Sequence, residues 1–175
     1  MKTLIASLAL TLPLSFAAAA PANDPTQAFL QQTFSAGVPQ AQALWLTGER
    51  RKAVTDILGH PPGSLRIRYW RQARRSAWVL EEIGKERPIT IGVVIDGGRI
   101  ADLRILAYRE ERGGEVQEPF FTRQFQGAEL NGKRRLDRSI DGISGATLSV
   151  SAVKRVAREA LYLASQLPAE SGDDA

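Results

Sequence analysis

The sequence of 175 residues contains no cysteine and only one histidine, His60. Without cysteine the chain cannot form a disulfide, a thiolate metal site, an iron–sulfur cluster or a cysteine nucleophile, and it lacks the residue that carries an N-terminal lipid. A single histidine excludes metal sites built from several histidines and leaves one candidate base for a Ser-His-Asp triad. Any redox chemistry must therefore come from a bound organic cofactor.

What remains is the composition of an ordinary globular domain, with 43% hydrophobic and 24% charged residues. The length is that of one domain. The formal net charge is +4, of which Lys2 supplies one. A basic chain raises nucleic acid as a possible partner, but the N-terminal segment argues against that partner.

The first 22 residues are predicted to be a secretory signal peptide. Lys2 precedes an apolar run of about 13 residues that ends at Phe16, and a tract of alanines follows. Cleavage is expected after Ala19 or Ala22. The run is shorter than the roughly 20 residues that cross a bilayer, and an uncleaved anchor is the alternative. We therefore expect a periplasmic protein that meets no nucleic acid and does not span the membrane once the signal is removed.

Residues 23–168 are predicted to form one α+β domain. Helical spacing of apolar residues predicts three helices, at 25–36, 47–58 and 149–166. Alternation predicts four strands, at 65–70, 76–83, 88–96 and 99–108. The Asp96-Gly97 pair between two alternating runs is a strong hairpin signal. We expect a mostly antiparallel sheet of about four strands with one face covered by helices, and Ala101, Leu103 and Ile105 pointing inward.

The segments between these elements are predicted to be irregular. The stretches 110–119 and 127–138 are polar loops, and Phe120, Phe121 and Phe125 form a short turn that inserts aromatic rings into the core. His60 lies in a Gly- and Pro-rich helix stop, where a capping or loop role is expected. The acidic tail, residues 169–175, is predicted to be disordered.

A cluster of arginines surrounds the first predicted hairpin. It comprises Arg66, Arg68, Arg71, Arg74 and Arg75. Such a cluster is either a solvated strand face or a surface for an anionic ligand or membrane.

The most informative segment is Asp141-Gly142-Ile143-Ser144-Gly145-Ala146-Thr147. Its small residues let another molecule approach the backbone closely. It directly precedes a predicted helix, whose N-terminal N–H groups favour a phosphate. If Thr147 lies in the first turn, Ser151 and Lys154 share its face and add a hydroxyl and a cation. These features indicate a phosphate near Thr147.

Other interpretations of this segment remain open from the residues alone. A Gly-rich loop with Thr147 or Ser149 as an ordinary N-cap would have the same composition. The segment lacks the Gly-Lys-Ser/Thr ending of a nucleotide-binding P-loop. It is also not the Gly-x-Ser-x-Gly turn of a hydrolase.

The same segment resembles the flavinylation motif of the FMN-binding domain family, D-x-x-[ST]-G-A-[ST]. That family includes the covalent-flavin subunits of the sodium-pumping quinone reductase and of the Rnf complex. The resemblance implies that Thr147 is joined to FMN through a phosphoester by a separate flavin transferase. It implies that Asp141, Ser144, Gly145 and Ala146 form the recognised part of the motif.

A looser match lies upstream. Glu110-Glu111-Arg112-Gly113, with Phe120-Phe121 and Gln124-Phe125-Gln126-Gly127 after it, is similar to the family's E-[ST]-x-G loop and its F…QF-x-G segment. The sequence departs from the family pattern at Glu111, where a small hydroxyl residue is usual. The resemblance extends over residues 88–167 and implies FMN contacts at Glu110 and Gly113.

The flavin ring would need an apolar wall beside the attachment point. The candidates are Trp78, Phe120, Phe121 and Leu148, and plain core packing is the alternative for each aromatic residue. Lys154 is the candidate cation for the phosphate.

The resemblance implies an exported electron carrier with one covalent FMN. A membrane redox protein would donate the electrons, and an extracytoplasmic acceptor would receive them. A role as carrier fits better than stand-alone catalysis, because no acid–base pair is evident beside Thr147. Two alternatives are a cofactor-free exported binding module that uses the arginine-rich hairpin, and a flavin-dependent reductase with its own substrate.

Overall fold

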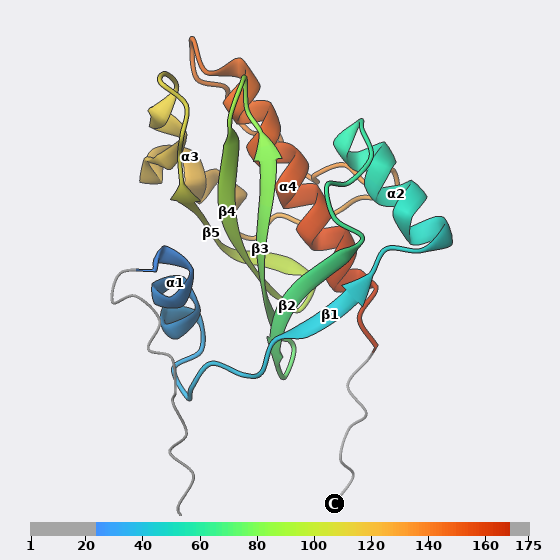
Figure 1. Cartoon of the computed structure of the whole chain (residues 1–175). Helices are drawn as coiled ribbons and strands as arrows, with labels where there is room; N and C mark the ends of the chain where they lie inside the picture. Colours follow the sequence, from blue (N-terminus) through green and yellow to red (C-terminus); the bar gives the residue numbers. More distant parts are fainter. Residues whose placement is uncertain (1–23, 169–175) are drawn as a thin grey trace, which may run out of the picture.

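The computed structural model describes residues 24–168 as one α+β domain (Figure 1). The predicted signal peptide and the predicted disordered tail lie outside these residues. None of the helices in this range combines the length and the hydrophobicity that a membrane-spanning segment requires.

A five-stranded antiparallel sheet forms the centre of the domain. Its strands pair in chain order, so the sheet is an open meander. They are β1 (Gln42–Trp45), β2 (Arg66–Gln72), β3 (Arg75–Ile83), β4 (Pro88–Asp96) and β5 (Arg99–Ala107). Gly97 and Gly98, both at positive φ, form the turn between β4 and β5, as the hairpin signal predicted.

The four strands expected from the sequence are confirmed, and a fifth joins them. Strand β1 has only four residues and lies at the edge of the sheet, paired with β2. Four residues are too few to show the alternation of apolar and polar residues that predicts a strand. The pairing with β2 is what identifies this segment as a strand.

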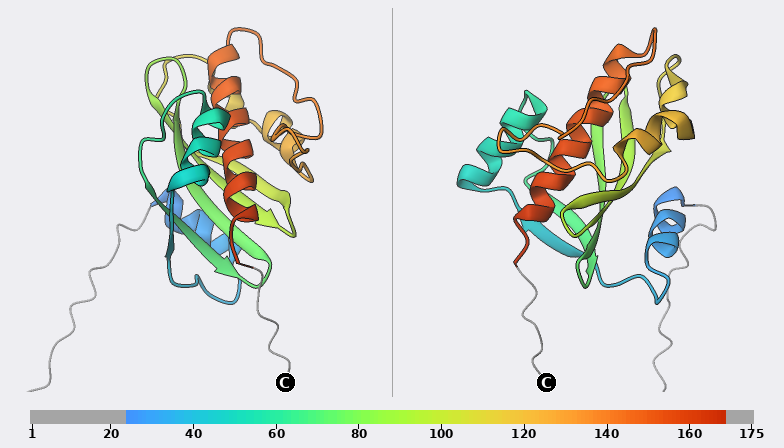
Figure 2. Two further views of the ribbon diagram at one scale, coloured as in Figure 1. Left: turned by 90° about the vertical axis from the view of Figure 1, so that its right-hand side faces the viewer. Right: turned by 180° about the vertical axis from the view of Figure 1, so that it is seen from behind.

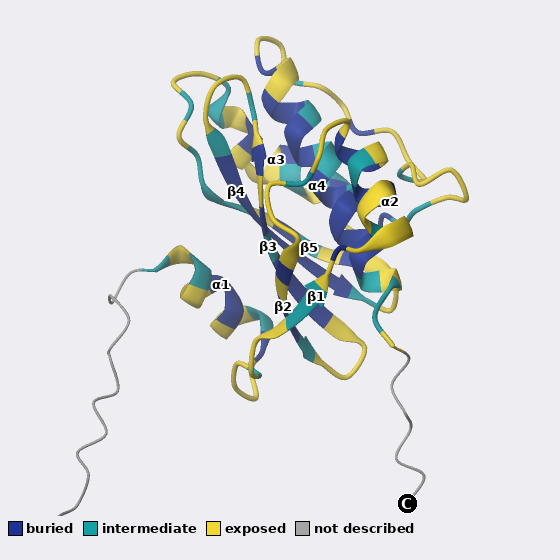
Figure 3. Ribbon diagram, turned by 45° about the vertical axis from the view of Figure 1, so that its right-hand side comes forward, coloured by how far each residue is buried: buried dark blue, intermediate teal, exposed yellow. Residues whose placement is uncertain are grey.

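One face of the sheet carries the larger core. It packs against α2 (Gly48–Leu58) and α4 (Thr147–Ser165). Trp78 from β3 and Ile91 from β4 face this core, where Val153 and Val156 of α4 meet them. Figure 3 shows α4 buried along the side that faces the sheet. The apolar stripe predicted for the last helix is thus the surface that attaches it to the sheet.

The second face of the sheet is also partly covered, which corrects the expectation of a single covered face. Helix α1 (Pro25–Thr33) packs there through Phe29 and Leu30, on the opposite side from α2 and α4 (Figure 2). The ring of Phe29 lies directly over Gly92 of β4, where a Cβ atom would come within 2.9 Å of it. Helix α1 can therefore pack closely because Gly92 has no side chain.

The expected facing of β5 is wrong at its beginning. Ile100 is buried and Ala101 is exposed, although Leu103 is buried as predicted. The register between β4 and β5 shifts between Val94 and Ile95. A β-bulge of this kind inserts a residue and reverses the alternation.

The connection from β5 to α4 contains short helices. They are a 3₁₀ turn (Gly114–Gln117), α3 (Pro119–Thr122) and a second 3₁₀ turn (Arg123–Phe125). Phe121 and Phe125 are fully buried and meet edge to face. The predicted insertion of aromatic rings into the core is confirmed for these two residues, whereas Phe120 is 63% exposed.

Candidate functional site

Three segments that are distant in the sequence meet at one end of the sheet, at the top of Figure 1. They are the β3–β4 turn, the loop after β5 and the first turn of α4. Together they surround a cavity of about 650 Å³, which is within the range of small-molecule sites. Its lining residues are Lys85, Glu86, Arg87, Glu110, Glu111, Arg112, Gly145, Ala146, Thr147, Leu148 and Ser149.

Thr147 is the first residue of α4, and it is exposed on the cavity. The N-cap is Ala146, which makes no side-chain capping bond. Among residues 24–168, no group forms a hydrogen bond with the Thr147 hydroxyl. The interpretation of Thr147 or Ser149 as an ordinary N-cap is therefore wrong, and the hydroxyl of Thr147 is available for chemistry.

The chain enters α4 through a tight turn. The N–H of Ala146 donates to the carbonyl of Ile143 at 3.0 Å, and Gly145 has a φ of +80°. A Cβ atom on Gly145 would meet nothing within 4 Å. Gly145 therefore allows the positive φ that other residues disfavour. It also leaves the approach to Thr147 open.

The other motif residues surround this turn. Asp141 is exposed, and its backbone N–H donates to the side chain of Gln124 at 2.7 Å. Ser144 is exposed and lines a second cavity of about 560 Å³, which shares Glu111, Arg112 and Gly145 with the first. Asp141 lies outside the lining of both cavities.

The loop after β5 is joined to the start of α4 at two points. The Tyr108 hydroxyl donates to the carbonyl of Arg112 at 2.6 Å and lies 2.9 Å from the hydroxyl of the buried Ser149. Gly113 lies against Ala146, where an added Cβ atom would be 3.0 Å from the Ala146 Cβ. The predicted contact residue Gly113 therefore lets the loop approach α4 closely.

Glu110 joins the same loop to the β3–β4 turn. Its Oε1 accepts hydrogen bonds from the backbone N–H groups of Arg87 at 3.0 Å, Glu86 at 2.8 Å and Lys85 at 2.5 Å. These bonds, led by those from Arg87 and Glu86, hold the pKa of Glu110 below its ordinary value. Glu110 is therefore an anion at the rim of the cavity at neutral pH.

The cations at the cavity differ from the predicted one. Lys154 donates from Nζ to the carbonyl of Ile140 at 2.7 Å and does not line the cavity. Its side chain reaches the loop before the motif, two helical turns from Thr147. Arg87 and Arg112 do line the cavity, and within residues 24–168 their guanidinium groups have no ion-pair partner.

Of the candidates for an apolar wall, only Leu148 lines the cavity, and it is 52% exposed. Trp78 is fully buried in the main core and stacks on Tyr69 at 5.0 Å between ring centroids. Its indole N–H donates to the hydroxyl of Ser76 at 3.0 Å. Because its ring is enclosed by protein atoms, Trp78 packs in the core and does not reach the cavity.

The sequence interpretation did not identify several residues that shape the cavity. Arg87 and Lys85 belong to the β3–β4 turn, and Tyr108 precedes the loop. No local pattern distinguishes them from other surface residues.

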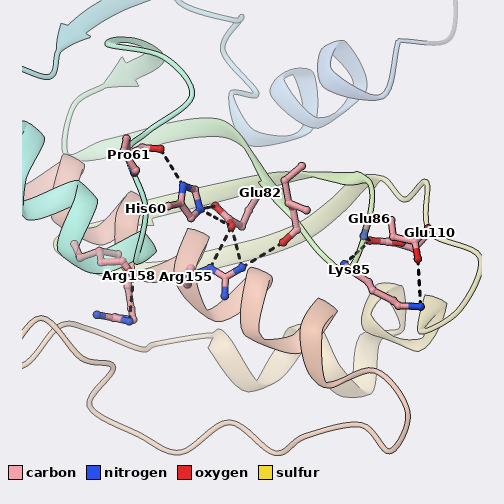
Figure 4. A network of polar contacts seen from close by, with 10 residues as sticks. His60, Pro61, Glu82, Lys85, Glu86, Glu110, Arg155 and Arg158 are labelled. Carbon is pink, nitrogen blue, oxygen red and sulfur yellow. Dashed lines mark hydrogen bonds and ion pairs between the residues drawn. The ribbon is translucent and has the colours of Figure 1, made fainter.

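His60 has the loop role that its position suggested. It contacts the carbonyl of Pro61 at 2.9 Å and the carboxylate of Glu82 at 2.9 Å. Arg155 of α4 donates to the same carboxylate at 2.8 Å (Figure 4). The histidine therefore connects the end of α2 to β3 and α4, away from Thr147.

The arginine-rich hairpin is partly used within the domain. Arg74 and Arg75 both form ion pairs with Asp96. Burial alone would raise the pKa of Asp96, but the hydrogen bonds from Arg74 and Arg75 outweigh it and lower that pKa. Arg71 donates to the carbonyl of Pro168 at 2.6 Å. Only Arg66 and Arg68 of the cluster lack such partners within residues 24–168.

The comparison with protein families agrees with this geometry. Residues 84–162 match the model of the FMN-binding domain family. This segment is an FMN-binding domain. No curated protein matches the chain.

The match covers each part of the cavity. The match begins at Gly84, includes the loop after β5 and extends through most of α4. It therefore contains the three segments that converge on Thr147 and gives the protein a flavin-binding role. The match leaves out the N-terminal part of the fold, which comprises α1, β1, α2, β2 and β3. These elements nevertheless complete the sheet and its core.

Proposed function

We propose that this protein is an electron carrier in which FMN is joined to the Thr147 hydroxyl through a phosphodiester. The observation that carries the proposal is the exposed Thr147 hydroxyl. It is free of hydrogen bonds within residues 24–168 and opens onto a cavity inside the FMN-binding domain. When bound, FMN supplies the redox chemistry, and the chain supplies attachment and electrostatics.

The residues around Thr147 suit the attachment step. A threonine hydroxyl is a weak nucleophile and needs an external base, and among the lining residues none forms a hydrogen bond with it. A separate flavin transferase would take the hydroxyl proton while Thr147 Oγ1 attacks the phosphorus of an activated FMN donor, whose leaving group departs. The open turn at Gly145 gives such an enzyme access to the acceptor.

The same end of the domain suits a phosphate. The first N–H groups of α4 have no partners within the helix, and the helix dipole adds positive potential there. Arg87 and Arg112 add two cations at the cavity. After attachment the phosphodiester carries one negative charge, which these groups would neutralise, and Leu148 offers an apolar contact for the ring.

The proposed place of action is outside the cytoplasm. The support is the sequence of residues 1–22, with its cation, short apolar run and alanine-rich end. A membrane redox protein would donate electrons, and an extracytoplasmic protein would accept them. Covalent attachment suits that setting, because a lost flavin could not be replaced readily there.

The experiment that tests the proposal is the intact mass of the mature protein isolated from its native exported compartment. The expected mass exceeds that of the chain by one FMN less one water, and Thr147→Val abolishes the increase. Thr55→Val is the matched control, because Thr55 also lies on a helix but its hydroxyl bonds to the carbonyl of Arg51. An unmodified wild-type mass, in a cell that flavinylates other exported proteins, would refute covalent attachment.

A further inference from the structure

The β3–β4 turn presents three consecutive backbone N–H groups to one atom. They belong to Lys85, Glu86 and Arg87, and all three donate to Oε1 of Glu110 at 2.5 to 3.0 Å. Successive N–H groups that converge in this way form a concave anion-binding nest. Figure 4 shows the Glu110 carboxylate at this turn. Glu110, which supplies the anion in the nest, follows these three residues by 23 to 25 positions in the sequence.

Gly84 makes room for that anion. A Cβ atom on Gly84 would lie 2.7 Å from Glu110 Oε1 and 3.0 Å from Cδ1 of Ile89. Gly84 has no positive φ, so its backbone conformation does not require glycine. The absence of a side chain at this position therefore serves the approach of the carboxylate.

The geometry also restricts what Glu110 can do for a ligand. A carboxylate oxygen has two lone pairs, and three N–H groups already share Oε1. That oxygen cannot accept a further bond from a flavin. Through these bonds Glu110 also holds the turn, which supplies Lys85, Glu86 and Arg87 as one wall.

We propose that Glu110 is a positioning residue, which fixes the β3–β4 turn so that Arg87 and the neighbouring backbone form the wall of the flavin cavity. This role rests on the proposed function, because it assumes that FMN occupies the cavity. Loss of the carboxylate would leave three N–H groups without their acceptor. The turn would then relax, and the wall opposite Thr147 would no longer be fixed.

Two substitutions, one at Glu110 and one at Gly84, test the contact between the carboxylate and the β3–β4 turn. Glu110→Ala removes the acceptor of the three N–H groups, and Gly84→Ala adds a methyl group that displaces the carboxylate without changing any charge. Both are made in the Thr147→Val background, so that FMN binds reversibly and its dissociation constant can be measured by flavin fluorescence. Gly63→Ala is the control, because a Cβ atom there meets nothing within 4 Å and its φ is not positive.

We expect each variant to weaken FMN binding at least tenfold, and the double variant to weaken it no further than the stronger single variant. Non-additivity is expected because both changes break one contact. Amide chemical shifts of residues 85–87, recorded without flavin, should move in both variants and stay unchanged in the control. Unfolding midpoints of the variants should remain close to that of the parent protein, since the contact lies at the exposed rim.

A chemical rescue separates positioning from general structural damage. In Glu110→Ala, formate should enter the nest, restore the amide shifts of residues 85–87 and recover FMN affinity, whereas chloride at equal ionic strength should not. Failure of formate to restore either readout would overturn the role of Glu110.

The remaining outcomes are distinct. If wild-type protein carries FMN and both variants bind FMN as tightly as their Thr147→Val parent, the positioning role is wrong and the proposed function stands. If wild-type protein from its native exported compartment carries no FMN and the Thr147→Val protein binds none, the proposed function is wrong and this role is overturned with it.

Discussion

At the scale of single residues, Glu159 is a buried acid that no hydrogen bond within residues 24–168 satisfies. It lies on α4 and is 4% exposed. Burial raises its pKa to about 8, and the charge of Glu82 adds to the rise while His60 opposes it. In the native state Glu159 therefore stays protonated between pH 4.5 and about pH 8, where an unfolded glutamate is ionised.

This difference predicts a loss of stability as pH rises. Between pH 4.5 and pH 8 the native state binds the Glu159 proton and the unfolded state does not, so the free energy of unfolding falls by about 4 kcal/mol for this group. Glu159→Gln should flatten that fall, as measured by urea denaturation at pH 5 and pH 8. Glu86→Gln, at an exposed turn residue, is the control. Equal slopes in Glu159→Gln and the wild type would contradict the assignment.

His60 acts in the same direction in this pH range. Its hydrogen bond to Glu82, followed by that to Pro61, raises its pKa above the ordinary value. The stabilisation from protonated His60 is fully present below its unfolded pKa and is lost as pH rises through the folded pKa. The double variant of His60 and Glu159 is therefore the appropriate reference for a pH-independent baseline.

Tyr108 provides a second prediction at the residue scale. Tyr108→Phe removes the hydroxyl that joins the carbonyl of Arg112 to Ser149. At about 1 kcal/mol for each hydrogen bond, urea denaturation should show a loss of about 1 to 2 kcal/mol. Tyr162→Phe is the control, because its hydroxyl forms no hydrogen bond within residues 24–168. Equal losses in both variants would show that the Tyr108 hydroxyl contributes nothing particular.

At the scale of elements, α4 has two functions at different places along its length. Its buried stripe attaches it to the sheet, and its first turn presents Thr147 to the cavity. Because Val150, Val153 and Val156 are buried, the position of the first turn is fixed by packing further along the helix. Thr147 is therefore exposed, while the helix that carries it is held in place by packing.

Helix α1 gives a prediction at the same scale. Gly92→Ala would put a Cβ atom 2.8 Å from the Phe29 ring, so α1 should separate from the sheet, with a loss of about 1 to 3 kcal/mol. Hydrogen exchange of the α1 amides should accelerate, while that of α4 should not. Gly132→Ala, where a Cβ atom meets nothing within 4 Å, is the control. Unchanged exchange in α1 would mean that Phe29 does not hold the helix.

At the scale of the whole molecule, a covalent flavin would stay with the chain after unfolding. We expect wild-type protein to keep its flavin absorbance after guanidinium denaturation and desalting, and Thr147→Val protein to lose it. Thr147→Val should also depend on added FMN for part of its stability, because a reversible ligand stabilises only by mass action. Flavin that separates from the denatured wild type would indicate tight but non-covalent binding.

Much of the fold follows from local patterns. The last helix, the strand at 88–96 and the turn at Gly97-Gly98 match the structure, because periodicity and turn chemistry act over a few residues. The motif that ends at Thr147 and its position at a helix start are equally local. The sequence by itself thus determined the attachment candidate and the main elements that surround it.

Only the tertiary structure decided which residues accompany Thr147. It placed Arg87 and Arg112 at the cavity, and it placed Lys154 and Trp78 elsewhere. Contacts such as Glu110 with the β3–β4 turn join segments more than twenty residues apart. They depend on how the strands pair. A local sequence pattern does not contain such long-range contacts. Periodicity specifies which face of a helix or strand is buried, but not which residue of another element will pack against that face.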